Sequence, residues 1–219
     1  MSPGIFPSIA MGFKPTAMRK AAGIFKSDFP RKRLKPLYNI QKLLILYPLL
    51  LFKGTQMTNH EIKIAFQEYD SLTELDNSDQ QLCLEAVKAM ANSHSPYSKF
   101  RVGVAMRLQS GKILYASNQE NVAYPSGLCA ERVALFNWGA NHPDDPIETM
   151  AITAHTDEFV INKPITSCGA CLQVLAEYEK KQDRQINILL YCQKGPIWKI
   201  KGIQNQLPFL FFEDRLVIQ

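Results

Sequence analysis

Cys129-Ala130-Glu131 and Cys168-Gly169-Ala170-Cys171 are the two stretches that decide the fold and the chemistry of this chain. The second has the C-x-x-C spacing of metal-binding thiols, and the first adds a third thiol followed two residues later by a carboxylate. A structural zinc usually takes four protein ligands, and no histidine stands at ligand spacing near these cysteines. Three thiols therefore predict a zinc ion with one position left for water, which is typical of a catalytic site.

Glu131 is the candidate general acid and base of this site. Zinc lowers the pKa of a bound water from 15.7 to about 7, so that hydroxide becomes available at neutral pH. A carboxylate beside the metal can take a proton from that water and pass it to a leaving group. Two alternatives remain: Cys168 and Cys171 form a redox pair, or Glu131 serves only as a negative charge in the first turn of a helix.

Each cysteine stretch precedes a segment with helical character, residues 132–138 and 172–181. Helix N-termini carry a partial positive charge and lower the pKa of nearby thiols. Both positions therefore favour the thiolate form that binds a metal.

Composition indicates one ordinary globular domain with an extension. The chain has 219 residues, of which 46% are hydrophobic and 21% are charged. Its five cysteines do not form a disulfide framework, since three belong to the metal set and Cys83 and Cys192 have the apolar surroundings of small buried residues. A reducing compartment follows, and we expect a cytoplasmic protein.

The basic charge belongs to the first part of the chain. Residues 1–56 hold ten Lys or Arg against the single acidic residue Asp28, a net charge of +9 in a chain whose total is +5, which leaves −4 for residues 57–219. We expect residues 1–56 to be a basic, poorly ordered N-terminal extension and residues 57–219 to be the catalytic domain, with the functional chain beginning at Met57. An organelle-targeting lead is the alternative.

Two classes of partner are excluded by these patterns. The mildly acidic catalytic domain shows no basic stripe with interleaved aromatic residues, so we expect no nucleic-acid partner. The apolar run 43–52 is interrupted by Pro48 and is too short to cross a bilayer as a helix, so we expect no membrane partner.

The pattern of apolar residues predicts an α/β domain. Helical spacing favours helices over residues 60–75 and 78–93, the second with Asn77 or Ser78 as its N-cap. Strand candidates cover residues 101–108, 112–117, 148–155, 186–192 and 197–201. Alternating strands and helices predict a three-layer α-β-α sandwich with a mixed five-stranded central sheet.

Several motifs, in order and spacing, resemble the cytidine deaminase family of zinc-dependent, three-cysteine nucleoside deaminases. The resemblance covers about residues 60–212 and rests on Pro96-Tyr97-Ser98-Lys99-Phe100-Arg101-Val102-Gly103, Asn118-Gln119-Glu120-Asn121, Tyr124-Pro125, Leu128-Cys129-Ala130-Glu131-Arg132 and Ser167-Cys168-Gly169-Ala170-Cys171-Leu172-Gln173-Val174-Leu175. It implies hydrolytic deamination of cytidine and deoxycytidine to uridine and deoxyuridine with release of ammonia, as in pyrimidine salvage, by a zinc-bound hydroxide with a glutamate proton shuttle.

The resemblance also implies roles for particular residues. The zinc ligands correspond to Cys129, Cys168 and Cys171, and the proton shuttle to Glu131. The substrate contacts correspond to Asn118 and Glu120 for the ribose hydroxyls, Phe100 for the pocket wall, the backbone of Ala130 for the pyrimidine, and Phe211 for an aromatic stacked on the base in a neighbouring subunit. This implies a homo-oligomer with shared active sites, a tetramer or else a dimer. A polar turn at Asn118 and Glu120, and simple packing of Phe211, are the alternatives.

Two residues depart from the family pattern. The family usually has Pro where this chain has Ser167, and Arg where it has Leu172. Three thiolates on a divalent zinc leave a net negative site, which that Arg normally tempers through hydrogen bonds to sulfur. We expect the helix dipoles, Arg132 or another donor to replace it, and activity to be reduced or shifted in pH.

Other functions remain open. A blasticidin-type or other nucleoside-analogue deaminase would keep the zinc set and Glu131 but would not need Asn118 and Glu120. A polynucleotide or tRNA deaminase usually has His-x-Glu at the zinc motif, where this chain has Cys129-Ala130-Glu131. A non-catalytic, zinc-stabilised oligomerisation module would make Glu131 incidental.

Overall fold

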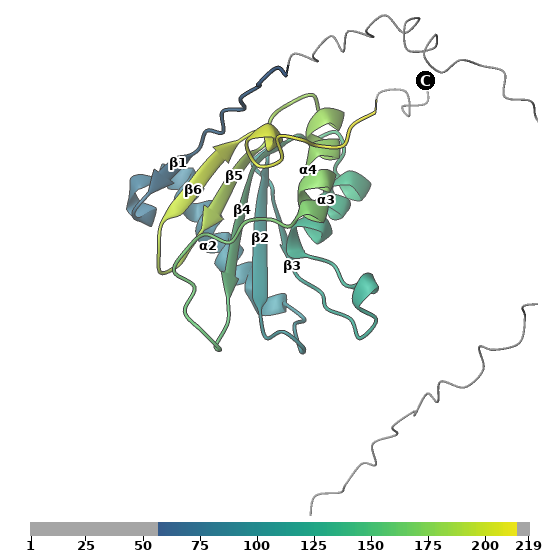
Figure 1. Ribbon diagram of the computed structural model, residues 1–219. Helices are drawn as coiled ribbons and strands as arrows, with labels where there is room; N and C mark the ends of the chain where they lie inside the picture. The colour runs from purple at the N-terminus through teal and green to yellow at the C-terminus, as the bar shows by residue number, and fades with distance from the viewer. Residues whose placement is uncertain (1–56, 214–219) are drawn as a thin grey trace, which may run out of the picture. The chain divides into compact units, whose positions relative to one another are not determined.

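The computed structural model describes residues 57–213, which are built on a six-stranded sheet with the order β1-β6-β5-β4-β2-β3 (Figure 1). The strands are β1 (Gln67–Tyr69), β2 (Arg101–Leu108), β3 (Ile113–Ser117), β4 (Ile147–His155), β5 (Asn187–Tyr191) and β6 (Ile197–Lys201). β4 and β5 run parallel, and the other neighbouring pairs run antiparallel. The sheet is therefore mixed, as predicted. The predicted extension at residues 1–56 lies outside the described residues, as do residues 214–219.

Helices cover both faces of this sheet. They are α2 (Asn77–Ala89), α3 (Ala130–Asn141) and α4 (Gly169–Lys181), with short 3-10 turns at Leu72–Glu74, Met90–Asn92, Tyr124–Ser126 and Ile203–Asn205. α3 and α4 lie side by side on one face, and α2 lies on the other (Figure 1). The predicted three-layer α-β-α sandwich is confirmed. Within the described part of the chain, no helix is both long enough and apolar enough to cross a bilayer.

The molecule has two hydrophobic cores, one on each face of the sheet, and successive side chains of the central strands belong to them in turn. On β2, Val104 and Met106 belong to the cluster that packs under α3 and α4, whereas Ala105 belongs to the cluster under α2. β4 repeats the pattern, with Met150 on the first side and Ala151 on the second. Successive side chains of a strand point to opposite faces, so strands covered on both sides are apolar at nearly every position.

Two glycines permit close packing near the site. A Cβ at Gly103 on β2 would collide with the backbone oxygen of Ala86 in α2. A Cβ at Gly139 in α3 would lie 2.6 Å from the hydroxyl oxygen of Tyr178 in α4. Glycine at these positions lets α2 approach the sheet and lets α3 and α4 approach each other.

The predicted helix over residues 60–75 is wrong. Residues 57–66 form no helix, and β1 and a 3-10 turn follow them, so the sheet has six strands instead of five. Ile62, Ile64 and Phe66 recur at every second residue, which is the period of a strand. The ring of Phe66 lies 4.9 Å from that of Trp198 on β6, where β1 pairs antiparallel at the edge of the sheet.

The N-cap of α2 also differs from the prediction. Asp76, not Asn77 or Ser78, caps the helix, because its Oδ1 accepts a 2.9 Å hydrogen bond from the backbone N–H of Asp79. The carboxylate of Asp79 is buried and accepts hydrogen bonds from Arg107 on β2 at 2.9 Å and from Lys199 on β6 at 2.7 Å. These contacts join the start of α2 to two strands.

Candidate zinc site and substrate pocket

The N-termini of α3 and α4 bring three thiols together. Cys129 is the N-cap of α3, Cys168 is the N-cap of α4, and Cys171 lies in the first turn of α4. The Sγ atoms of Cys129 and Cys168 are 3.9 Å apart, those of Cys168 and Cys171 are 3.4 Å apart, and all three lie within 4.8 Å of one another. Four-coordinate zinc with Zn–S bonds of about 2.3 Å places its sulfur ligands about 3.8 Å apart. The donor set and its spacing therefore fit zinc.

Two thiols of this cluster, those of Cys129 and Cys171, have pKa values that are shifted in opposite directions. The pKa of Cys129 lies well below its usual value, because the Cys171 thiol donates to it and Arg132 and Cys168 add hydrogen bonds that outweigh the effect of burial. The pKa of Cys171 is raised by the same contact with Cys129 and by burial. Of these two thiols, Cys129 therefore loses its proton first, and its thiolate lies at the positive end of α3.

Arg132 places a cation beside two of the thiols. It lies in the first turn of α3 and acts as a hydrogen-bonding neighbour of both Cys129 and Cys171. Its Nε is buried and has no hydrogen-bond partner among residues 57–213, while its NH2 group donates to the Gly127 carbonyl at 3.4 Å. Leu172 is buried in the core below α4. Arg132 and the N-termini of α3 and α4 are therefore the groups in place to offset the thiolate charge.

Glu131 lies beside the thiols in the first turn of α3, and its side chain is buried, with the residue 5% exposed. Burial raises the pKa of this carboxyl group above its usual value. Its own backbone N–H, the Ser167 hydroxyl and the Cys171 thiol partly oppose that shift, while the charge of Cys129 adds to it. A carboxyl group with a raised pKa exchanges protons more readily near neutral pH.

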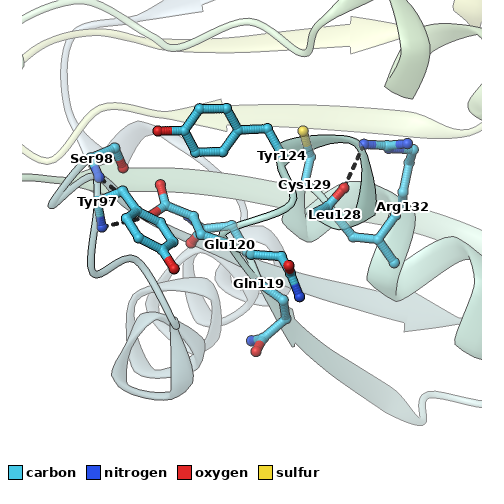
Figure 2. Close-up of a pocket in the computed structure, with 11 residues that line it drawn as sticks. Tyr97, Ser98, Gln119, Glu120, Tyr124, Leu128, Cys129 and Arg132 are labelled. Carbon is cyan, nitrogen blue, oxygen red and sulfur yellow. Dashed lines mark hydrogen bonds between the residues drawn. The ribbon is translucent and has the colours of Figure 1, made fainter. Parts of the chain in front are cut away.

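A cavity of about 550 Å³ opens next to this cluster (Figure 2). Its lining comes from the segments that follow α2, β3 and the Tyr124–Ser126 turn, and from the start of α3. The residues are Tyr97, Ser98, Asn118, Gln119, Glu120, Asn121, Tyr124, Gly127, Leu128, Cys129 and Arg132. Figure 2 shows Tyr97, Glu120 and Tyr124 on one side of the view and Cys129 and Arg132 on the other. The volume suits a ligand the size of a nucleoside.

Glu120 and Asn118 are both held by protein contacts. Oε2 of Glu120 accepts hydrogen bonds from the backbone N–H groups of Tyr97 at 2.9 Å and Ser98 at 3.2 Å. Burial acts to raise the pKa of Glu120, but these bonds and the Ser98 side chain lower it overall. Oδ1 of Asn118 accepts from Ser93 Oγ at 2.6 Å and from the Val102 N–H at 2.8 Å, and its Nδ2 donates to the Phe100 carbonyl at 2.9 Å.

The remaining predicted residues are not among those that line this cavity. Phe100 is partly buried and its ring lies 6.3 Å from that of Phe159. Ala130 is fully buried at the start of α3. Phe211 is 71% exposed, and its backbone is held by Gln173, which donates to its carbonyl at 2.7 Å.

Sequence reasoning gave no role to Tyr97 and Tyr124, which line the cavity. Their rings lie 6.1 Å apart in an edge-on arrangement. Both belong to motifs that carry the family resemblance, so the signal was present. Their meeting across 27 positions of sequence could not be deduced without the fold.

Comparison with known proteins agrees with this geometry. A family model for the cytidine and deoxycytidylate deaminase zinc-binding region matches residues 45–163, more than half of the chain. A cytidine deaminase of Halalkalibacterium halodurans is 38% identical over 98 residues, covering 45% of this chain and 70% of that protein. A probable cytidine deaminase of Dictyostelium discoideum is 30% identical over 146 residues, covering 65% of this chain and 90% of that protein.

A solved structure shows the same likeness in three dimensions. The crystal structure of cytidine deaminase from Burkholderia pseudomallei matches with a TM-score of 0.51 and 31% identity, covering 60% of this chain and 97% of that one. A buried glutamate beside three convergent thiols on this fold defines the class as zinc-dependent hydrolytic deaminases. Within that class, the chain belongs to the cytidine and deoxycytidylate deaminase family.

Proposed function

We propose that this chain hydrolyses cytidine and deoxycytidine to uridine and deoxyuridine, consuming one water and releasing one ammonia. The observation that carries the proposal is the buried carboxyl group of Glu131 beside the sulfur atoms of Cys129, Cys168 and Cys171. Only the exocyclic amine of the base leaves, and the oxygen of the water replaces it.

The cysteines, Glu131 and Arg132 have separate roles in this reaction. Cys129, Cys168 and Cys171 would hold the zinc, which when bound supplies a Lewis acid that makes a water nucleophilic near neutral pH. Glu131 takes one proton from the attacking water and delivers it to the ring nitrogen, and then takes the second proton from the resulting hydroxyl group and delivers it to the amine, which departs as ammonia. Arg132 offsets the negative charge of the thiolates.

Contacts to the sugar and base come from the cavity and its surroundings. Glu120 offers Oε1 to the ribose hydroxyls, because Oε2 is engaged by Tyr97 and Ser98. Asn118 has a second Nδ2 hydrogen left for the sugar, since an amide nitrogen carries two. We assign Phe100 to the wall of the pocket and the Ala130 backbone to the pyrimidine.

The charges of the cavity favour a nucleoside over a nucleotide. Glu120 is ionised at neutral pH, since its pKa lies below the usual value. Arg132 is the sole Lys or Arg among the residues that line this cavity, and it is directed to the thiols. A phosphate monoester with nearly two negative charges would meet a carboxylate and no uncommitted cation. We therefore expect cytidine to be preferred over cytidine 5′-monophosphate.

We further propose a homotetramer with shared active sites, with a dimer as the alternative. Phe209 and Phe211 are 83% and 71% exposed and lie near the C-terminus of the described residues. A phenylalanine this exposed gains stability by packing against another chain. Phe211 would then stack on the base in the neighbouring subunit. Sedimentation of wild type and Phe211→Ala tests this: a tetramer that turns over normally without the ring would contradict the shared site.

We propose a cytoplasmic pyrimidine-salvage enzyme whose catalytic domain is residues 57–219, with its functional start at Met57. N-terminal mass analysis of the mature protein tests the start, since a product that begins at Met1 would contradict it.

An absorbance assay for cytidine combined with zinc analysis tests the reaction. We expect one zinc per chain and turnover of cytidine, with Glu131→Gln lowering kcat by roughly 10²- to 10⁴-fold, the contribution of general acid–base catalysis. If wild type and Glu131→Gln bind zinc equally and neither turns over cytidine, the site would instead be a structural zinc module.

A further inference from the structure

The side-chain amide of Asn118, which lines the cavity, is held in three directions by the protein. Its Oδ1 accepts hydrogen bonds from Ser93 Oγ at 2.6 Å and from the Val102 N–H at 2.8 Å, and its Nδ2 donates to the Phe100 carbonyl at 2.9 Å. An amide oxygen has two lone pairs, and an amide nitrogen has two hydrogens. These contacts therefore leave one Nδ2 hydrogen for a ligand.

Ser93 provides the side-chain contact in this arrangement, and it comes from a different segment than the two backbone contacts. Those two lie at the start of β2, whereas the short 3-10 turn after α2 ends at Ser93. The backbone N–H of His94 donates to the Asn118 carbonyl at 3.0 Å, and the N–H of Glu120 donates to the His94 carbonyl at 2.8 Å. The segment that carries the hydroxyl is therefore fixed against the segment that carries the amide.

The direction of the Ser93–Asn118 hydrogen bond follows from its acceptor. The amide does not turn over, because its nitrogen would then face the Val102 N–H and its oxygen would face the Phe100 carbonyl. An amide oxygen can only accept, so the Ser93 hydroxyl donates its single hydrogen. Ser93 Oγ also lies 3.2 Å from Ser95 Oγ, but the 2.6 Å contact with Asn118 is the shorter of the two. A side chain held in this way before the ligand arrives loses less conformational freedom on binding.

We propose that Ser93 is a positioning residue whose hydroxyl holds the Asn118 amide in place, so that the remaining Nδ2 hydrogen is directed to a hydroxyl oxygen of the sugar. This inference rests on the proposed deaminase function, because the sugar belongs to the nucleoside substrate of that reaction. Ser93 is not among the residues that line the cavity, so it acts through Asn118. Its loss should weaken substrate binding and leave the chemical step nearly unchanged.

Steady-state kinetics on the full-length, zinc-loaded protein give the first test. We expect Ser93→Ala to raise KM for cytidine about 5-fold, the scale of one hydrogen bond between neutral groups, while kcat and zinc content stay within about twofold of wild type. Ser93→Thr retains a hydroxyl and should restore most of the affinity. Ser95→Ala removes a hydroxyl from the same loop but keeps the donor to Asn118, so it should leave KM unchanged. An unchanged KM in Ser93→Ala, or a KM in Ser93→Thr as high as in Ser93→Ala, would overturn the proposal.

A double-mutant cycle separates this role from a general effect on the loop. Ser93→Ala should raise KM no further in a protein that already carries Asn118→Ala, because the side chain through which Ser93 acts is then absent. An equal rise in KM in both backgrounds would show that Ser93 acts independently of Asn118 and would overturn the proposal.

The side-chain amide signal of Asn118 in a 15N NMR spectrum gives a third test that needs no turnover. The signal is assigned by its absence from the spectrum of Asn118→Asp, which keeps an acceptor for Ser93. It should shift in Ser93→Ala and return in Ser93→Thr, and an unshifted signal would overturn the proposal. A wild-type protein that does not deaminate cytidine refutes the proposed function, and the amide spectrum then still decides whether Ser93 holds Asn118.

Discussion

Sγ of Cys129 lies 3.9 Å from Sγ of Cys168, although 39 positions of sequence separate the two residues. Each is the N-cap of a helix, and α3 and α4 pack against each other on one face of the sheet. The metal site is therefore a property of the packing of two helices, which Gly139 allows to approach closely.

Removal of one thiol should therefore abolish metal binding. We expect Cys168→Ser to lose most of its zinc and to lower kcat/KM by more than about 100-fold, beyond the 10- to 100-fold typical of outer-shell partners. Cys83→Ala is the matched control, because Cys83 lies on the buried side of α2, which covers the opposite face of the sheet. Metal analysis and the cytidine assay check both variants. Equal zinc content in Cys168→Ser and wild type would contradict the three-thiol site.

Arg132 should carry the role that the family pattern gives to the residue at Leu172. We expect Arg132→Met to lower zinc affinity or activity by about 10- to 100-fold, because the thiolates then lose their cationic neighbour. Leu172→Arg should not improve zinc retention, since Leu172 is 8% exposed in the core and an unpaired guanidinium there would destabilise the fold by about 3–5 kcal/mol. Zinc titration and urea unfolding measure the two effects. A Leu172→Arg protein that is stable and more active than wild type would show that Arg132 is insufficient.

Glu120 should set the preference for nucleosides. We expect Glu120→Gln to raise KM for cytidine about 10-fold or more with a smaller change in kcat, because a charge-assisted hydrogen bond to the ribose becomes neutral. The same change removes the carboxylate that repels a 5′-phosphate. The ratio of kcat/KM for cytidine to that for cytidine 5′-monophosphate should therefore fall. Gln119→Ala at the same cavity is the control, and an equal fall in that variant would assign the selectivity to the shape of the pocket.

The sequence was most informative where chemistry and periodicity are local. The three thiols and Glu131 were identified from residue type and spacing, and strands such as β2 and β6 were predicted at their observed bounds because their apolar patterns are unambiguous. The fold class followed from the alternation of these elements. The prediction of zinc as the metal is confirmed by the match to the zinc-binding region and by the thiol cluster.

What the sequence did not reveal depends on tertiary contacts. β1 has only three residues and is recognisable because it pairs with β6, so the apolar spacing over residues 60–75 predicts a helix where the structure has a short strand and a 3-10 turn. The engagement of Asn118 by Ser93 and Val102 requires the end of β3 to meet the segment that follows α2. Arg132 was one of several candidates from the sequence, and its place beside Cys129 and Cys171 depends on the packing of α3 against α4.

The N-cap of α2 should make stability depend on pH. The pKa of Asp76 is lowered to about 2 from its usual 3.8, because Ser78 and the backbone N–H of Asp79 donate hydrogen bonds to its carboxylate. A carboxyl group with a lowered folded-state pKa contributes stability that is present above pH 3.8 and is lost as the pH falls toward 2. Asp76→Ala should therefore destabilise the protein by about 1 kcal/mol at pH 7 and by less at pH 3. Asp76→Asn is the control, since an amide oxygen still caps the helix but does not titrate. Urea unfolding at both pH values measures the difference, and an equal penalty for Asp76→Ala at pH 7 and pH 3 would show that the charge of Asp76 does not contribute.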